Sequence, residues 1–321
     1  MILGPELRSE MQALELNSCL LYREGRLLDT YEEAPGASGE QLPINSCTKS
    51  VLSALICMAM AQGRFPAPET PVIECFDFGS RKAAAKNEHD SRAQITVEHL
   101  LTLTAGFQWS EFGGSKSFPT MTRSADWIEY VWTQPMANAP GSKWVYNSGV
   151  SQLLAHLLRQ AVGMPVARYA ERELFGPLGI RQYAWKTDPH GTHTGGYGLE
   201  LSALDLLKLG RLYLQNGVWE GDSLLPRSLT DHSVAPAIAV SPPERGYYGW
   251  HWWADAVTPE GEDAAAKTVE PLSYFYARGY GGQFVIVVPS RAAVVVLTRR
   301  PRKKGESPHE WFRRRLAPLL V

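Results

Sequence analysis

The sequence predicts an α+β protein, an α/β sandwich whose antiparallel sheet is built from both ends of the chain and flanked by helices. Near the N-terminus, strand-like runs at residues 18–22 and 26–31 are separated by a short polar turn containing Gly25, the pattern of a β-hairpin. Near the C-terminus, three more strand-like runs follow one another, at residues 272–278, 283–288 and 292–298.

The chain between these strands is dominated by helical patterns, set off by capping residues, glycines and prolines. Helices are expected at residues 6–15, 81–92, 96–104, 125–133, 149–162, 166–174, 202–216 and 308–320. The aromatic run at residues 246–253 is strand-like, and residues 299–304 read as a basic, solvated loop. The expected domains are a sheet domain of residues 1–75 plus 245–321 and a mainly helical domain of residues 76–244, with the active site in the cleft between them.

One further helix, between Pro43 and Gly63, is apolar on nearly every face and should be buried all round. Asn45 or Ser46 is expected to cap its first turn. The few polar residues of this apolar helix are therefore candidates for a functional role. Ser46 and Lys49 are three positions apart, which places them on one face of the helix, one turn from each other.

This S-x-x-K pair predicts nucleophilic catalysis, in which a base takes the proton of an otherwise weak serine nucleophile. A lysine can be that base if burial lowers its pKa well below about 10.4. The helix N-terminus would add a positive dipole end and unpaired N–H groups for an oxyanion. A purely structural alternative stays open at this point, with Ser46 as a cap and Lys49 extending its amine to solvent.

Composition narrows the classes of function. The 321 residues carry a net charge of −1, which argues against a nucleic-acid or membrane-surface partner. Ten Trp and thirteen Tyr indicate a cleft lined by aromatic residues, where we expect Trp109 to contact substrate. His190 and His193 lack a neighbouring ligand cluster, so neither a metal nor another cofactor is expected.

The four cysteines show no C-x-x-C spacing and are expected to be reduced, packed thiols. The first ten residues do not have the pattern of a signal peptide, and no run of eighteen apolar residues occurs. A cytoplasmic enzyme acting on a small molecule is therefore the expectation, and the sequence is silent on oligomeric state.

Several motifs in order connect the chain to a known superfamily. They are Ser46-Cys47-Thr48-Lys49, Thr96-Val97-Glu98-His99-Leu100-Leu101 with Gly106, Pro140-Gly141-Ser142-Lys143-Trp144-Val145-Tyr146-Asn147-Ser148, Pro177-Leu178-Gly179-Ile180 and Gly279-Tyr280-Gly281-Gly282-Gln283. The chain resembles the serine β-lactamase and penicillin-binding protein superfamily over nearly its whole length. The nearest branch is that of class C β-lactamases, related esterases and aminohexanoate-oligomer hydrolases. The resemblance implies a β-lactamase-like fold and an acyl-enzyme on Ser46.

The resemblance also implies roles for residues of the Y-x-N motif. Tyr146 matches the family tyrosine that faces the S-x-x-K pair, and with Lys49 beside it the phenolate would be favoured as a proton shuttle. Ser148 stands where β-lactamases usually have Asn. Its hydroxyl can still hydrogen-bond Lys49 but offers less to a substrate amide.

The third family motif, Lys-Thr-Gly or His-x-Gly on an edge strand, aligns with Ala277-Arg278-Gly279. The lysine that helps hold the carboxylate of a β-lactam is absent, and the direction of Arg278 on a strand is uncertain. With this register, the backbone N–H of Tyr280 would join that of Ser46 as the oxyanion donors. A register slip would transfer that role to Gly281 or Gly282. Gly279 and Gly281 are expected at the substrate.

These features predict a serine hydrolase that cleaves a small ester or amide, with an esterase preferred because the lysine of the third motif is missing. A β-lactamase or D-amino-acid peptidase is the second enzyme hypothesis. A non-catalytic acyl-binding or sensor domain is the alternative of another class.

Overall fold

A mixed set of strands and helices surrounds one central helix in the computed structural model, which describes residues 2–75, 91–258, 270–300 and 306–321. The main sheet is antiparallel in the pairings described, with strand order β2-β1-β13-β12-β11-β10-β9-β8. Its strands are β1 (Leu16–Arg23), β2 (Arg26–Glu32), β8 (Ile238–Ala239), β9 (Tyr247–Tyr248), β10 (Trp253–Val257), β11 (Leu272–Gly279), β12 (Gln283–Val288) and β13 (Ala293–Arg299).

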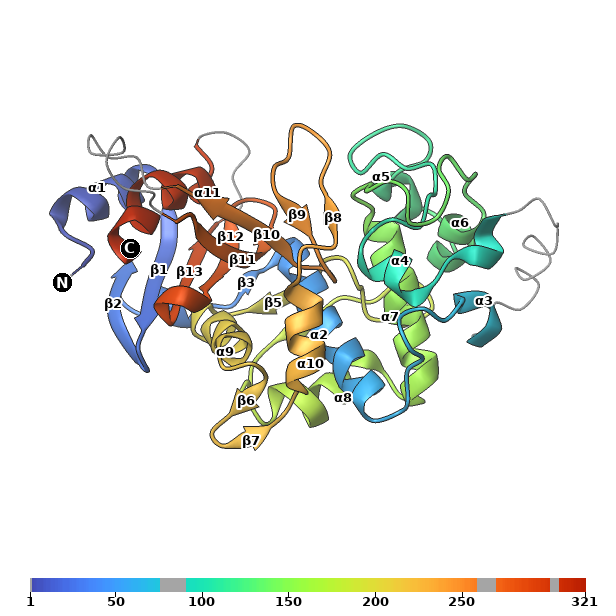
Figure 1. The fold of residues 1–321 in the computed structure, drawn as a ribbon, viewed down its shortest axis with the longest axis horizontal. Helices are drawn as coiled ribbons and strands as arrows, with labels where there is room; N and C mark the ends of the chain where they lie inside the picture. The colour runs from blue at the N-terminus through green and yellow to red at the C-terminus, as the bar shows by residue number, and fades with distance from the viewer. Residues whose placement is uncertain (1, 76–90, 259–269, 301–305) are drawn as a thin grey trace.

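The two ends of the chain meet within this sheet, as its second and third strands. β1 pairs with β13 from Leu16 opposite Arg299 to Arg23 opposite Ala293. β12 and β13 are buried on both faces, which explains their runs of Val, Ile and Leu. The β-lactamase-like α+β architecture expected from the sequence is confirmed, with strands from both termini and a helical insertion (Figure 1).

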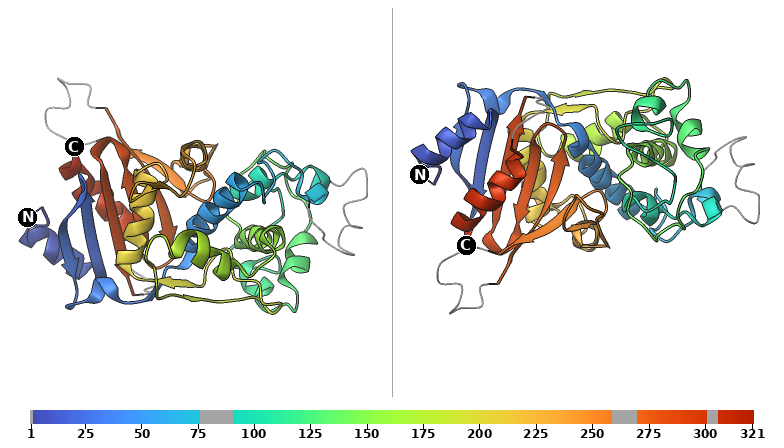
Figure 2. Two further views of the ribbon diagram at one scale, coloured as in Figure 1. Left: turned by 90° about the horizontal axis from the view of Figure 1, so that it is seen from below. Right: turned by 90° about the horizontal axis from the view of Figure 1, so that it is seen from above.

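Helices cover both faces of the sheet, as the two turned views show (Figure 2). One face carries α1 (Pro5–Ala13) and α11 (Pro308–Trp311), and the other carries α9 (Ala203–Leu214). α9 lies so close to the strands that a Cβ at Gly210 would be 2.5 Å from a methyl group of Val294. Two elements from residues 76–244 belong with the sheet: α9 packs against it, and β8 is one of its strands. The expected division into two domains stays a prediction.

The helical part lies at the other end of the molecule and is shown on the right of Figure 1. Its helices are α3 (Val72–Cys75), α4 (Val97–Leu101), α5 (Phe118–Met121), α6 (Trp127–Trp132) and α7 (Ser148–Val162), and α8 (Val166–Ala170) follows α7 at the lower middle of the figure. Between the two parts runs the central helix α2 (Thr48–Ala61), and α10 (Arg227–Val234) packs against it. Short strands complete the fold: β3 (Leu42–Pro43), β4 (Ala184–Trp185), β5 (Leu199–Leu201), β6 (Val218–Trp219) and β7 (Asp222–Ser223).

The predicted helices and hairpins are largely confirmed, with four corrections. The central helix begins in a 3₁₀ turn, Asn45–Cys47, and no side chain caps it, so the expected cap was wrong. The aromatic run at 246–253 is divided between β9 and the start of β10. Arg299 is 6% exposed at the end of β13, so the predicted solvated loop does not include it. The C-terminal segment is three short helical pieces, α11, a π-helix Phe312–Leu316 and a 3₁₀ helix Ala317–Leu320.

Two expectations reach beyond the described residues. Most of the helix expected at 81–92 lies outside them, and residues 91–94 form a 3₁₀ turn. Residues 301–304 of the expected basic loop also lie outside them. Cys19, Cys47 and Cys57 are buried free thiols, and Cys75 is an exposed one. None of the helices in the described ranges combines the length and the apolar character that crossing a membrane requires.

Candidate active site

Ser46 lies at the floor of a cavity of about 580 Å³ between the sheet and the helical part. Walls from both parts enclose it, and many of its lining residues are aromatic. The lining residues are Asn45, Ser46, Trp109, Glu111, Phe112, Phe118, Lys143, Trp144, Val145, Tyr146, Ser148, Tyr197, Ser241, Pro242, Pro243, Glu244, Trp253, Arg278 and Tyr280. Seven of the nine site residues predicted from the sequence are therefore at or directly below this cavity.

The local backbone explains how Ser46 reaches the cavity. Asn45 adopts a left-handed conformation, with φ of 49°, and its side-chain amide donates to the carbonyl of Tyr280 at 2.7 Å. Thr48 donates its hydroxyl to the carbonyl of Asn45 at 2.6 Å and so closes the first turn. Ser46 is thus fixed at the junction of α2 and the β11–β12 turn.

Lys49 lies one turn below Ser46 and is 1% exposed. Its Nζ donates to Ser148 Oγ at 2.9 Å and to the carbonyl of Gly196 at 2.9 Å, and lies 3.4 Å from Ser46 Oγ. Burial lowers the pKa of Lys49 to about 8, although the carboxylate of Glu111 opposes this. The lysine is therefore buried as the sequence hypothesis required, and the alternative of a solvent-directed amine is wrong.

Tyr146 completes the arrangement. Its ring lies under Lys49, with Nζ 4.7 Å from the ring centroid, and stacks on Trp253 at 6.1 Å. Burial and the charge of Glu111 raise the pKa of Tyr146 well above its usual value, while a hydrogen bond with Ser46 lowers it. Burial and Glu111 both oppose the phenolate that the resemblance favours, so the protonation state of Tyr146 stays a prediction. A neutral Tyr146 hydroxyl is a proton donor.

Arg278 points into the cavity, which answers the question of its direction. Its guanidinium donates to the carboxylate of Glu244 and lies over the ring of Trp253, 5.1 Å from the centroid. The pair with Glu244 raises the pKa of Arg278 further against the effect of burial. The cation at this position is therefore already neutralised by a partner within the cavity.

The glycines of the β11–β12 turn shape the site without lining the cavity. At Gly279, a Cβ would lie 2.2 Å from the carbonyl oxygen of Ile44, so only glycine lets the strand approach the nucleophile's segment this closely. Gly281 has φ of +84° and accepts a hydrogen bond from Arg299 Nε at 2.7 Å. The assignment of the oxyanion donors to Ser46 and Tyr280 stays a prediction.

Glu111 is the main site residue that sequence reasoning missed. It follows Trp109 in the loop after α4, and its carboxylate accepts hydrogen bonds from Trp109 Nε1 at 2.8 Å and from the backbone N–H of Ser148 at 3.0 Å. The only sequence signal was a lone carboxylate in an aromatic loop, which is a weak indication without spatial context. Phe112 and Glu244 also line the cavity and were missed, because no motif marks them in the sequence.

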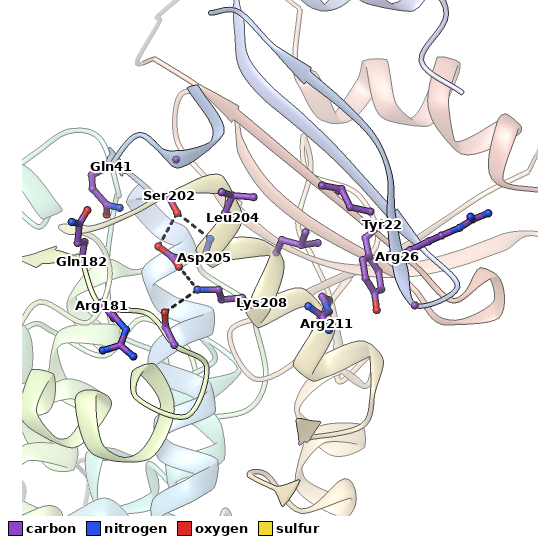
Figure 3. Close-up of a pocket in the computed structure, with 15 residues that line it drawn as sticks. Tyr22, Arg26, Gln41, Arg181, Gln182, Ser202, Leu204, Asp205, Lys208 and Arg211 are labelled. Carbon is purple, nitrogen blue, oxygen red and sulfur yellow. Dashed lines mark hydrogen bonds and ion pairs between the residues drawn. The ribbon is translucent and has the colours of Figure 1, made fainter. Parts of the chain in front are cut away.

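Another hollow, of about 640 Å³, lies elsewhere on the surface and is drawn in Figure 3. Its central polar side chains are engaged with one another: Ser202 Oγ donates to Asp205 at 2.7 Å, and Lys208 pairs with Asp205 at 2.8 Å and with the carbonyl of Gly179 at 3.0 Å (Figure 3). Within the described ranges, no group of three or more His, Cys, Asp and Glu could hold a metal ion. The chemistry therefore points to the Ser46 cavity.

Comparison with known families decides the wider relationship. The Beta-lactamase family matches residues 20–318. The chain belongs to this family. Among solved structures, a Bacillus anthracis protein described by similarity as a 6-aminohexanoate-dimer hydrolase superposes with a TM-score of 0.76 at 18% identity, over 95% of this chain and 79% of that one. At this identity the likeness shows the shared fold.

Two curated relatives of this β-lactamase-family chain match shorter segments. Monacolin J acid methylbutanoyltransferase from Aspergillus terreus is 24% identical over 165 residues, 44% of this chain and 37% of the relative. D-alanyl-D-alanine-carboxypeptidase/endopeptidase AmpH from Escherichia coli is 31% identical over 98 residues, 30% of this chain and 25% of the relative. The matched segments thus span well under two thirds of either relative, and their names cover different acyl chemistries.

The buried lysine predicts a pH dependence. Lys49 can take the proton of Ser46 only when it is uncharged, so kcat/KM should rise about tenfold per pH unit well below its pKa and level off above about pH 8. The measurement is kcat/KM against pH between 5.5 and 9.5 for any turned-over substrate. An acid limb below pH 6 would assign the base to another group.

Proposed function

We propose that this chain is a serine esterase, which hydrolyses a small uncharged ester through an acyl-enzyme on Ser46. One observation carries the proposal: Ser46, Lys49 and Tyr146 converge at the floor of an aromatic cavity whose arginine is paired with Glu244. A substrate carboxylate would have to compete with Glu244 for Arg278, which favours an uncharged ligand. The cavity volume of about 580 Å³ suits a small molecule.

The proposed reaction proceeds in two halves. Ser46 Oγ attacks the ester carbonyl while its proton passes to Lys49, and a C–O bond to the serine forms. Tyr146 donates its proton to the leaving alkoxide as the original ester C–O bond breaks, and its phenolate is then the base that takes a proton from the attacking water. The Lys49 ammonium returns its proton to Ser46 Oγ, 3.4 Å away, when the acid leaves. Water then attacks the acyl-enzyme, and the acid and free Ser46 are released.

Amide hydrolysis uses the same atoms and is the closest alternative, since an amine leaving group needs the Tyr146 proton even more than an alkoxide does. A β-lactamase or D-amino-acid peptidase is less favoured, because Ser148 replaces Asn and Glu244 occupies the only cation aligned with the third motif. A binding domain without turnover would acylate once and stop.

The deciding experiment compares a short-chain p-nitrophenyl ester with a chromogenic cephalosporin, for the wild type and Ser46→Ala. We expect Ser46-dependent ester turnover and little cephalosporin turnover. Rapid Ser46-dependent cephalosporin turnover would replace the esterase proposal with the β-lactamase one. A stoichiometric burst without a steady state would indicate the binding domain.

A further inference from the structure

Glu111 is fixed beside the reacting groups by hydrogen bonds that converge on its two oxygens. One oxygen accepts from Trp109 Nε1 at 2.8 Å and from the backbone N–H of Ser148 at 3.0 Å. The other oxygen accepts from the hydroxyl of Ser148. Two of these three donors belong to one residue, so the carboxylate and Ser148 form a rigid unit at the N-terminus of α7.

Ser148 joins this carboxylate to the catalytic lysine. Its Oγ accepts from Lys49 Nζ at 2.9 Å while its own proton is donated to Glu111. The Lys49 amine thus has three acceptors around it: the hydroxyls of Ser148 and Ser46 and the carbonyl of Gly196. An ammonium has three protons to donate, so this surrounding matches lysine after it has taken the proton of Ser46.

We propose that Glu111 is a positioning residue that acts through Ser148 to fix the amine of Lys49 and to stabilise the ammonium formed when Ser46 is deprotonated. The proposal rests on the proposed serine chemistry and does not depend on an ester being the substrate. It assigns Lys49, Ser148 and Glu111 to one relay, in which a buried positive charge appears opposite a half-buried carboxylate during acylation.

The other titratable groups near Lys49 cannot stabilise its ammonium form in this way. Cys47, on the same helix, is a buried thiol whose pKa is raised by burial, and Tyr146 presents its ring. His251 is buried, and desolvation together with Lys49 lowers the pKa of its imidazole to about 3, so it is neutral. Among the described neighbours of Lys49, Glu111 is the carboxylate that raises its pKa against burial.

The test uses a probe that reports on any activated serine. A fluorophosphonate reacts as Ser46 Oγ bonds to phosphorus, fluoride leaves and the serine proton passes to Lys49. The second-order rate constant for labelling of Ser46 is measured at a series of pH values, by following the gain in intact mass of the full chain. Glu111→Gln keeps the size of the side chain and removes its charge. We expect the acid limb to move about one pH unit lower and the plateau to fall about tenfold, because Lys49 becomes a weaker base.

Two further variants make the test specific. Glu244→Gln makes the same chemical change in the same cavity but beside Arg278, so its acid limb should stay at the wild-type pH. Glu111→Asp keeps the charge and should keep the limb near the wild-type position. The proposal would be overturned if the acid limb of the pH–rate profile of Glu111→Gln coincided with that of the wild type, or if Glu244→Gln shifted it by the same amount.

A loss of folding in Glu111→Gln is distinguished from a change in reactivity by its melting temperature. If Glu111→Gln does not melt like the wild type, Ser148→Ala is used, which removes the hydroxyl between the two charges. Its limb should also move lower, and an unmoved limb overturns the relay. A wild type that reacts with the fluorophosphonate at Ser46 but hydrolyses no ester would defeat the esterase proposal, and the Glu111 test would still be decided by the same rate constants.

Discussion

Replacing Ser46 with alanine is expected to lower kcat/KM by at least roughly 10³-fold, because the nucleophile, base and proton donor act as one unit and fail together. Lys49 and Tyr146 would remain in place but would have no hydroxyl to activate. The measurement is steady-state turnover of the best substrate, together with intact mass after rapid quenching, where only the wild type should gain the mass of an acyl group.

A matched variant separates this loss from a general effect of the substitution. Ser223 is exposed in the two-residue strand β7, and Ser223→Ala should leave turnover and acyl adduct at wild-type levels. Full activity of Ser46→Ala, or an acyl group carried by another residue, would end the proposed mechanism.

Replacing Tyr146 with phenylalanine is expected to lower kcat by about 10²-fold for an alkyl ester, the loss typical of a positioned general acid. The ring remains, so the contacts with Lys49 and Trp253 should be kept and the melting temperature little changed. Only the hydroxyl, whose pKa is raised by burial, is removed.

The leaving group provides the control for this second variant. A p-nitrophenolate departs without a proton, so the p-nitrophenyl ester should lose much less activity than the alkyl ester. Both rates are measured on the same preparation. Equal losses for the two esters would show that Tyr146 supports the structure of the site and does not donate to the leaving oxygen.

Much of the fold was predictable because its signals are local. The hairpin around Gly25, the strands around Gly279–Gly282 and the apolar helix after Ser46 all show their period within a dozen residues. Ser46 and Lys49 were predictable for the same reason, since one helical turn relates them. Local spacing alone does not identify Tyr146, which was predicted from the resemblance that several motifs in order establish.

The remaining features depend on contacts across the chain. Asn45 does not cap α2, because its side chain bonds the carbonyl of Tyr280, 235 positions later. The direction of Arg278 is set by Glu244, 34 positions earlier, and the ring of Tyr146 stacks on Trp253, which is far away in the sequence. Glu111 is recognisable only when α7 brings Ser148 against it. The periodicity of the sequence does not indicate which distant residues contact one another.

The pairing of β1 with β13 also bears on how the molecule is made. Ser46 is synthesised early, yet β13 must insert between β1 and β12 before the β11–β12 turn can be held against Asn45. Such high contact order makes folding slow. A growing chain therefore carries Ser46 and an apolar helix for most of translation without the wall that completes the cleft. Catalytic competence is among the last properties that the polypeptide acquires, and the interval before it is when the exposed α2 most needs protection from aggregation.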